Sequence, residues 1–316
     1  MEKGWRYLMA SRRIIFMGTP EISSIYLQSL IDSDQNIIAV FTQPPRKKGR
    51  GMKIQQSPVH KLAEDNSISV FTPTDLNLNI PLNKIKELKP DLIVIMGYGL
   101  KIPKNILDLP EYGCINIHVS LLPRWRGASP IEYTLLNGDT EAGITIFKLI
   151  EKMDAGPIIF QDSIEIDNTI NKDDLTSKLN NIGKKSLIRI LPNIFDNKIK
   201  FKDQDNNKVT YTKKILPDMR KLDFNENVET IHNKIRAFSP YPCAWFELNN
   251  ERIKIIKSNF VKGNWLPSTI INDQFHIGCT FGKICPQIIQ REGKKPMLLS
   301  DFLKGYNFEI GTKINA

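Results

Sequence analysis

The segment Leu92–Met96 contains no polar side chain, and it constrains the fold of this chain more than any other feature. A strand that is apolar on both faces is typical of a parallel sheet covered by helices on both sides. Other apolar segments, at residues 14–17, 37–42 and 114–118, alternate with helical patterns. This alternation predicts an α/β fold with a Rossmann-like, mostly parallel sheet and helices on both of its faces.

Start and stop signals place the helices between these strands. Gly18-Thr19-Pro20-Glu21 predicts a helix through Leu30, with Thr19 as its N-cap. A second helix begins at Val59, and Ser129-Pro130 opens a third that ends at Asn137-Gly138. Two more strands and a helix are expected, at residues 143–149, 157–166 and 173–195.

The pattern changes after a polar stretch at residues 196–210, whose composition is typical of a linker. A helix at residues 227–238 is followed by short strand-like segments, which predict a small OB-like β-barrel. These segments are residues 245–248, 253–256, 269–271, 275–280 and 284–290. We therefore expect four parts: an extension at 1–11, a catalytic domain at 12–195, a linker at 196–210 and a barrel at 211–316.

Composition excludes several classes of protein. No apolar stretch approaches the roughly 18 residues that a membrane span needs, and residues 1–13 lack the apolar core of a secretory signal. The cysteines form no CxxC pair and the four histidines are scattered, so we expect no metal site and reduced thiols in a cytoplasmic protein. The cysteines are Cys114, Cys243, Cys279 and Cys285.

The net charge of +10 is concentrated in the last third of the chain. Residues 198–316 contain 20 lysines and arginines against 12 acidic residues, whereas residues 1–197 contain 24 against 22. A basic region of this kind suits an anionic partner such as a nucleic acid. Charge alone fits a lysine-rich solvated surface better, so both interpretations stay open.

A short segment near residue 50 is strongly basic. It contains five cations within eight residues, two glycines and no acid. Its prolines, glycines and like charges argue against a packed element, and it suits contact with a phosphate backbone. The alternative is a solvated surface loop. The cations are Arg46, Lys47, Lys48, Arg50 and Lys53.

Three side chains suggest acyl-transfer chemistry. Asn116 and His118 are two residues apart on one strand, so they share a face at its C-terminal end, where open α/β sheets bind ligands. Asp154 follows another strand in a loop that can return to the same crevice. An amide polarises a carbonyl, an imidazole moves a proton or stabilises an oxyanion, and a carboxylate orients the imidazole. A structural histidine beside a turn asparagine is the alternative.

Motifs for other chemistries are absent from the sequence. There is no G-x-G-x-x-G after the first strand, no P-loop and no G-x-S-x-G elbow. Dinucleotide binding, P-loop phosphate binding and serine hydrolysis therefore lack their usual mechanism.

The chain resembles the methionyl-tRNA formyltransferases over nearly all of residues 12–316. The matching residues are dispersed along this length: Ile14-Ile15-Phe16-Met17-Gly18-Thr19-Pro20, Val40-Phe41-Thr42-Gln43-Pro44, Gly49-Arg50-Gly51, Ser57-Pro58-Val59, Tyr98-Gly99-Leu100, Pro103-Lys104, Gly113-Cys114-Ile115-Asn116-Ile117-His118, Ser120-Leu121-Leu122-Pro123-Arg124-Trp125-Arg126-Gly127-Ala128, Thr210-Tyr211, Arg236-Ala237-Phe238, Pro240, Pro242 and Gly293-Lys294-Lys295.

The resemblance implies an enzyme that transfers formyl from 10-formyltetrahydrofolate, without a metal, to the α-amino group of methionine on initiator tRNA. It implies that Asn116, His118 and Asp154 are catalytic, and that the basic loop and the C-terminal barrel bind the tRNA. It also implies that one loop contacts the folate. Nothing in the sequence demands more than a monomer. The folate-contacting residues would be Ser120, Leu121, Leu122 and Pro123.

The sequence departs from the family pattern in three places. Val119 stands where the family usually has a smaller residue, and a β-branched side chain disfavours positive φ. Tyr241 replaces a tryptophan, and the first eleven residues match nothing. The alternative functions are a folate-dependent formyltransferase acting on glycinamide ribonucleotide or an amino sugar, a formyltetrahydrofolate hydrolase, and a non-catalytic RNA-binding protein.

Overall fold

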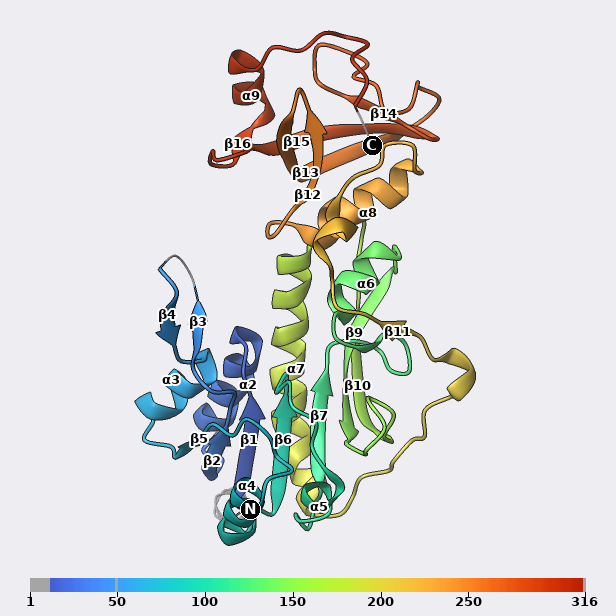
Figure 1. Ribbon diagram of the computed structural model, residues 1–316. Helices are drawn as coiled ribbons and strands as arrows, with labels where there is room; N and C mark the ends of the chain where they lie inside the picture. Colours follow the sequence, from blue (N-terminus) through green and yellow to red (C-terminus); the bar gives the residue numbers. More distant parts are fainter. Residues whose placement is uncertain (1–11, 49–50, 315–316) are drawn as a thin grey trace. The chain divides into compact units, whose positions relative to one another are not determined.

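The computed structural model describes residues 12–48 and 51–314 and divides the chain into two compact units (Figure 1). The first unit consists of the described residues up to Arg126, together with Gly143–Ser163 and Lys178–Tyr211. The second consists of Gly127–Ala142, Ile164–Ser177 and the described residues from Thr212 onwards. Each unit has its own hydrophobic core.

A seven-stranded sheet is the centre of the first unit (Figure 1). Its strands follow the order β10-β9-β7-β6-β1-β2-β5. The pairs from β5 to β7 are parallel and β9 is antiparallel to β7, which confirms the predicted mostly parallel sheet. The strands are β1 (Ile14–Gly18), β2 (Ile37–Phe41), β5 (Val70–Phe71), β6 (Leu92–Met96), β7 (Cys114–His118), β9 (Glu141–Lys148) and β10 (Ile158–Glu165).

Strand β6 is buried along its whole length, as its apolar sequence predicts. It pairs in parallel with β1, with Phe16 opposite Val94. One face of the sheet packs against α4 (Asn79–Leu88) and α5 (Lys104–Leu107). Helices α2 (Glu21–Asp32), α3 (Pro58–Asp65) and α7 (Lys172–Phe195) complete the unit, and residues 178–195 of α7 belong to it.

The prediction that Thr19 caps the first helix is wrong. Helix α2 begins at Glu21 with Pro20 at the N-cap position, and no side chain caps it. The hydroxyl of Thr19 lies one residue too early and instead donates to the carbonyl oxygen of Tyr98 at 3.0 Å. The side chain of Ser57, by contrast, caps α3 by accepting from the amide of His60.

The C-terminal part of the second unit is an antiparallel sheet with the order β12-β13-β15-β14, and β16 pairs with β15. Most of the expected short segments lie in these strands, and α8 (Val228–Phe238) matches the predicted helix. The short helix α9 (Leu299–Gly305) gave no sequence signal, because seven residues are too few to show a helical period. The strands are β12 (Ala244–Leu248), β13 (Glu251–Lys262), β14 (Ile277–Cys279), β15 (Gly282–Arg291) and β16 (Met297–Leu298).

The remaining elements are short. They are β3 (Arg46–Lys48), β4 (Lys53–Gln55), β8 (Arg126–Gly127), α6 (Pro130–Leu136), η1 (Asn206–Lys208), β11 (Tyr211–Thr212) and η2 (Pro217–Arg220). Over the part of the chain that the structure describes, no helix combines the length and the apolar character needed to cross a bilayer.

We predict that Gly183→Ala destabilises the first unit. A Cβ at Gly183, within α7, would clash with the ring and hydroxyl of Tyr26, which is fully buried on α2. Overpacking of this kind costs about 1–3 kcal/mol, which urea unfolding can measure. Tyr26→Phe in the same chain should recover part of the loss. A Gly183→Ala protein as stable as the unaltered one would contradict this packing, and Gly305→Ala, with open space around it, is the control.

Candidate active site

Strand β7 ends with the two predicted polar side chains, Asn116 and His118. In the antiparallel pairing with β9, Asn116 lies opposite Phe147 and His118 lies opposite Thr145. His118 is buried, whereas Asn116 is half-buried. Because side chains alternate along a strand, both point to the same face at the C-terminal end of β7.

A backbone carbonyl determines which nitrogen of His118 carries a proton. The Nε2 atom of His118 lies 2.8 Å from the carbonyl oxygen of Trp125. A carbonyl oxygen can only accept a hydrogen bond, so Nε2 is the donor. In the neutral imidazole, Nδ1 is therefore the unprotonated nitrogen.

The carboxylate of Asp154 lies on the Nδ1 side of His118. The distance from Nδ1 to Oδ2 is 3.9 Å, which is an ion-pair distance but too long for a direct hydrogen bond. The two side chains are only 8% and 13% exposed, so charge interactions between them are screened weakly by solvent. The structure therefore brings the predicted imidazole and carboxylate together.

Residues 120–123 form a loop that makes two hydrogen bonds with the hydroxyl of Thr145. Thr145 Oγ1 donates to the carbonyl oxygen of Ser120 at 2.6 Å and accepts from the amide of Leu122 at 3.0 Å. Gln161 Nε2 donates to the carbonyl oxygen of Leu122 and to Thr145 Oγ1, both at 2.9 Å. Sequence reasoning missed Thr145 and Gln161, because neither lies in a recognisable motif.

Val119 does not have a positive φ angle, although residues that follow this loop do. Positive φ angles occur at Trp125 (61°) and Gly127 (118°), whereas Val119 has none. The β-branched side chain at position 119 therefore does not conflict with the local backbone.

Three further residues support the site, and sequence reasoning gave them no role in it. Arg126 is 1% exposed, and its Nε and Nη2 atoms donate to Gln204 Oε1 at 3.0 and 2.7 Å. Thr210 Oγ1 accepts from the amide of Trp125 at 2.8 Å. Gln204 lies in the polar stretch whose composition resembles a linker, and no sequence pattern identifies it. Thr210 is among the residues that match the family, but that match assigns it no role.

The basic segment is partly a strand ribbon rather than an irregular loop. Strands β3 and β4 pair in antiparallel fashion, with Arg46 opposite Gln55 and Lys47 opposite Ile54. The expectation of an irregular loop was wrong because the two prolines precede the ribbon and the glycines follow β3, which leaves the strands free to pair. The side chains of Arg46, Lys47 and Lys53 are exposed, and Arg50 lies outside the described residues.

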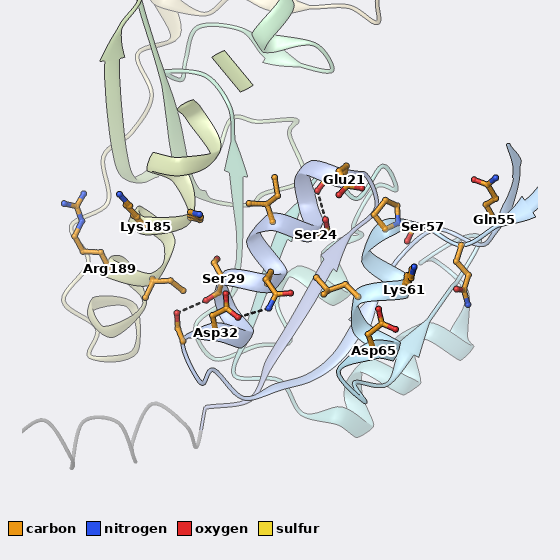
Figure 2. Close-up of a pocket in the computed structure, with 18 residues that line it drawn as sticks. Glu21, Ser24, Ser29, Asp32, Gln55, Ser57, Lys61, Asp65, Lys185 and Arg189 are labelled. Atoms are coloured by element: carbon orange, nitrogen blue, oxygen red, sulfur yellow. Dashed lines mark hydrogen bonds between the residues drawn. The ribbon is translucent and has the colours of Figure 1, made fainter. Parts of the chain in front are cut away.

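A groove of about 1210 Å³ lies elsewhere on the first unit (Figure 2). Helix α2 contributes Ser24, α3 contributes Lys61 and α7 contributes Lys185 to its lining. None of the predicted site residues lines this groove. This groove is therefore not the place where the predicted catalytic residues come together.

The thiols of Cys114 and Cys279 do not have the lowered pKa of a catalytic cysteine. Cys114, at the start of β7, is buried, and desolvation raises the pKa of its thiol to about 12. Burial likewise raises the pKa of Cys279 to about 12. A thiol becomes a good nucleophile when its pKa is lowered, so these two are structural. Among the described residues, no group of three or more His, Cys, Asp or Glu side chains is arranged to hold a metal ion.

Two family models match the chain and cover most of it. Residues 12–191 match the model of formyl transferase, and residues 214–307 match that of the formyl transferase C-terminal domain. The chain is 44% identical to the methionyl-tRNA formyltransferase of Ehrlichia chaffeensis over 93% of its own length and 97% of that protein. It is 38% identical to that of Rickettsia bellii, over 96% and 99% of the two chains.

Solved structures share the fold at lower sequence identity. An N-formyltransferase from Helicobacter canadensis, solved with folinic acid and dTDP-3-aminofucose, matches with a TM-score of 0.64 and 23% identity over 89% of this chain and 99% of that one. HypX from Aquifex aeolicus matches with a TM-score of 0.62 and 16% identity over 95% of this chain and 52% of that one.

We predict that Thr145→Val loosens the loop at residues 120–123. The substitution keeps the shape of the side chain but leaves the amide of Leu122 without its acceptor, which costs about 1–3 kcal/mol. Hydrogen exchange at the amide of Leu122 should accelerate by about five- to 150-fold, and that at the amide of Ile93 should not change. Thr145→Ser should behave as the unaltered chain. Unchanged exchange at Leu122 in the valine variant would show that the hydroxyl does not hold the loop.

Proposed function

Because the chain belongs to the formyl transferase family, we propose that it transfers the formyl group of 10-formyltetrahydrofolate to the α-amino group of methionine on initiator tRNA. The observation that carries this proposal is the match to methionyl-tRNA formyltransferases over 93–96% of the chain. The product is formylmethionyl-tRNA for translation initiation. We propose that the enzyme acts in the cytoplasm as a monomer.

In the proposed mechanism the neutral α-amino group of methionine attacks the formyl carbon. A bond forms between that nitrogen and the carbon, and negative charge develops on the formyl oxygen. The half-buried amide of Asn116 and the protonated Nδ1 of His118 are placed at one end of the sheet to donate to this oxygen. Asp154, 3.9 Å from Nδ1, stabilises the protonated imidazole.

The second half of the reaction breaks the bond between the formyl carbon and the folate nitrogen. The amine loses a proton, the folate nitrogen gains one, and the electron pair of the broken bond stays with that nitrogen. Nδ1 of His118 can deliver this proton, because Trp125 occupies Nε2. A water held by Asp154 is the alternative carrier. Neither route needs a covalent intermediate on the enzyme.

We also propose where the folate and the tRNA contact the chain. We propose that Ser120, Leu121, Leu122 and Pro123 contact the folate, since Thr145 holds this loop beside the end of β7. The exposed basic ribbon of β3 and β4 is proposed to contact the acceptor stem of the tRNA. The C-terminal sheet, within the most basic third of the chain, is proposed to bind the rest of the tRNA.

The alternative functions are less well supported. An amino-sugar or glycinamide ribonucleotide acceptor fits the same catalytic residues. The relatives at 38–44% identity, however, are methionyl-tRNA formyltransferases, whereas the N-formyltransferase solved with dTDP-3-aminofucose is 23% identical. A formyltetrahydrofolate hydrolase needs no tRNA-binding surface. A purely RNA-binding protein has no need for a buried imidazole beside a half-buried carboxylate.

We predict that His118→Ala removes formyl transfer and leaves tRNA binding intact. Loss of the imidazole removes an oxyanion donor and a proton carrier, so kcat should fall by at least about 10²–10⁴-fold. Filter binding should give an unchanged Kd for methionyl initiator tRNA. His60→Ala, which removes a histidine far along the sequence from β7, is the control. Loss of tRNA binding in His118→Ala would instead assign His118 a structural role.

We predict that replacing Arg46, Lys47 and Lys53 with alanine weakens tRNA binding and reduces its salt dependence. Each lost phosphate contact should make the slope of log K against log salt shallower by about 0.7–0.9. A control variant replaces Lys84 and Lys104, which lie outside the ribbon and pair with Glu87 and Asp108. An unchanged slope in the ribbon variant would exclude phosphate contact at the ribbon.

A further inference from the structure

Gln204 is a buried polar residue in an otherwise exposed stretch. Residues 201–203 and 205–208 are all exposed, whereas Gln204 is only 9% exposed. A linker that merely spans a distance has no reason to bury an amide, because burying a polar group is unfavourable unless it is hydrogen-bonded. The contacts of Gln204 therefore indicate what this stretch does.

The side chain of Gln204 bonds to both of the loops that carry the site. Its Nε2 atom donates to the carbonyl oxygens of Asp154 and Gly156, each at 2.8 Å. Its Oε1 atom accepts from the guanidinium of Arg126. Asp154 has a left-handed backbone with φ of 49°, a conformation that is uncommon for residues other than glycine, although aspartate adopts it more readily than most. Gln204 thus fixes the turn that aims the carboxylate of Asp154.

Thr210 bonds to the loop that orients His118. Its amide donates to the carbonyl oxygen of Pro123, its carbonyl oxygen accepts from the amide of Arg126, and its hydroxyl accepts from the amide of Trp125 at 2.8 Å. The carbonyl oxygen of that same Trp125 accepts from His118 Nε2. Thr210 thus fixes the residue that determines the tautomer of the imidazole.

We propose that Gln204 and Thr210 are positioning residues of the formyl-transfer site, Gln204 for Asp154 and Thr210 for His118. This inference rests on the proposed function for its chemistry. Neither residue touches the reacting atoms. Together they make the stretch at residues 204–210 a part of the site, which holds the imidazole and the carboxylate 3.9 Å apart.

The tautomer of His118 gives a direct readout. While Trp125 accepts from Nε2, the neutral ring must leave Nδ1 unprotonated toward the carboxylate of Asp154. If Trp125 is released, the neutral ring can move its proton to Nδ1, where Asp154 accepts it. Imidazole nitrogen NMR distinguishes the two tautomers, and the chain has four histidines to resolve.

The test compares Thr210→Val with Thr210→Ser. Valine keeps the shape but removes the acceptor of the Trp125 amide, whereas serine keeps it. At a pH where the ring is neutral, we expect the valine variant to show the Nδ1-protonated tautomer of His118 and the serine variant to match the unaltered chain. Releasing Trp125 also frees the ring to turn, so Nδ1 is no longer held beside Asp154. A misplacement of about 1 Å can cost about 10²-fold in rate, so we expect kcat of the valine variant to fall by at least about tenfold, with KM unchanged.

Gln204→Glu tests the contact of Gln204 with Asp154 and Gly156. Its outcome does not depend on whether the Thr210 variants fold. Glutamate keeps an acceptor for Arg126 but cannot donate to the carbonyl oxygens of Asp154 and Gly156. We expect kcat to fall with KM unchanged in a variant that remains folded, as circular dichroism checks, although the loss of these two hydrogen bonds lowers its melting temperature. A folded Gln204→Glu variant with unaltered kcat would overturn the role of Gln204.

Two outcomes would overturn the role of Thr210. One is a valine variant with an unaltered tautomer and kcat, and the other is a serine variant as impaired as the valine variant. The NMR readout needs no acceptor substrate. If the unaltered chain does not formylate methionyl-tRNA but Thr210→Val still changes the tautomer, the proposed function fails and the positioning role stands.

Discussion

The hydrogen bond from His118 Nε2 to the carbonyl oxygen of Trp125 is the interaction on which the site depends. It decides that Nδ1 is the nitrogen beside Asp154 and therefore the nitrogen available for chemistry. Strand β7 fixes the backbone position of His118 but not the orientation of its imidazole ring, because a side chain at the end of a strand can still rotate. The loop that returns from Ser120 to Arg126 supplies the second constraint.

This loop has an unfavourable backbone, and hydrogen bonds offset it. Trp125 adopts a left-handed conformation, which costs roughly 1–2 kcal/mol for a residue with a side chain. Its amide and carbonyl groups both have partners, Thr210 and His118. The hydroxyl of Ser120 donates to the carbonyl oxygen of Arg124 at 2.7 Å. Each such bond contributes about 0.5–1.5 kcal/mol, so a few of them are enough to hold the strained conformation.

The sequence predicts the parts of this protein that depend on local pattern. The apolar strand Leu92–Met96, the helix start at Ser129-Pro130 and the shared face of Asn116 and His118 are all visible within a few residues. The supporting contacts are not visible in the local sequence, because they join residues that are far apart along the chain. Thr210 lies 85 residues from Trp125, and Gln204 lies 78 residues from Arg126. Thr19 failed as a cap for the same reason, since Tyr98, 79 residues away, accepts from its hydroxyl.

The most direct test of the proposed function is a transfer assay with labelled 10-formyltetrahydrofolate and two acceptors, methionyl initiator tRNA and glycinamide ribonucleotide. We expect label on the tRNA alone, as formylmethionine. Label on the small acceptor alone would keep the pair of His118 and Asp154 as the catalytic centre. It would contradict the tRNA as substrate and leave the basic ribbon and the basic C-terminal region as solvated surface.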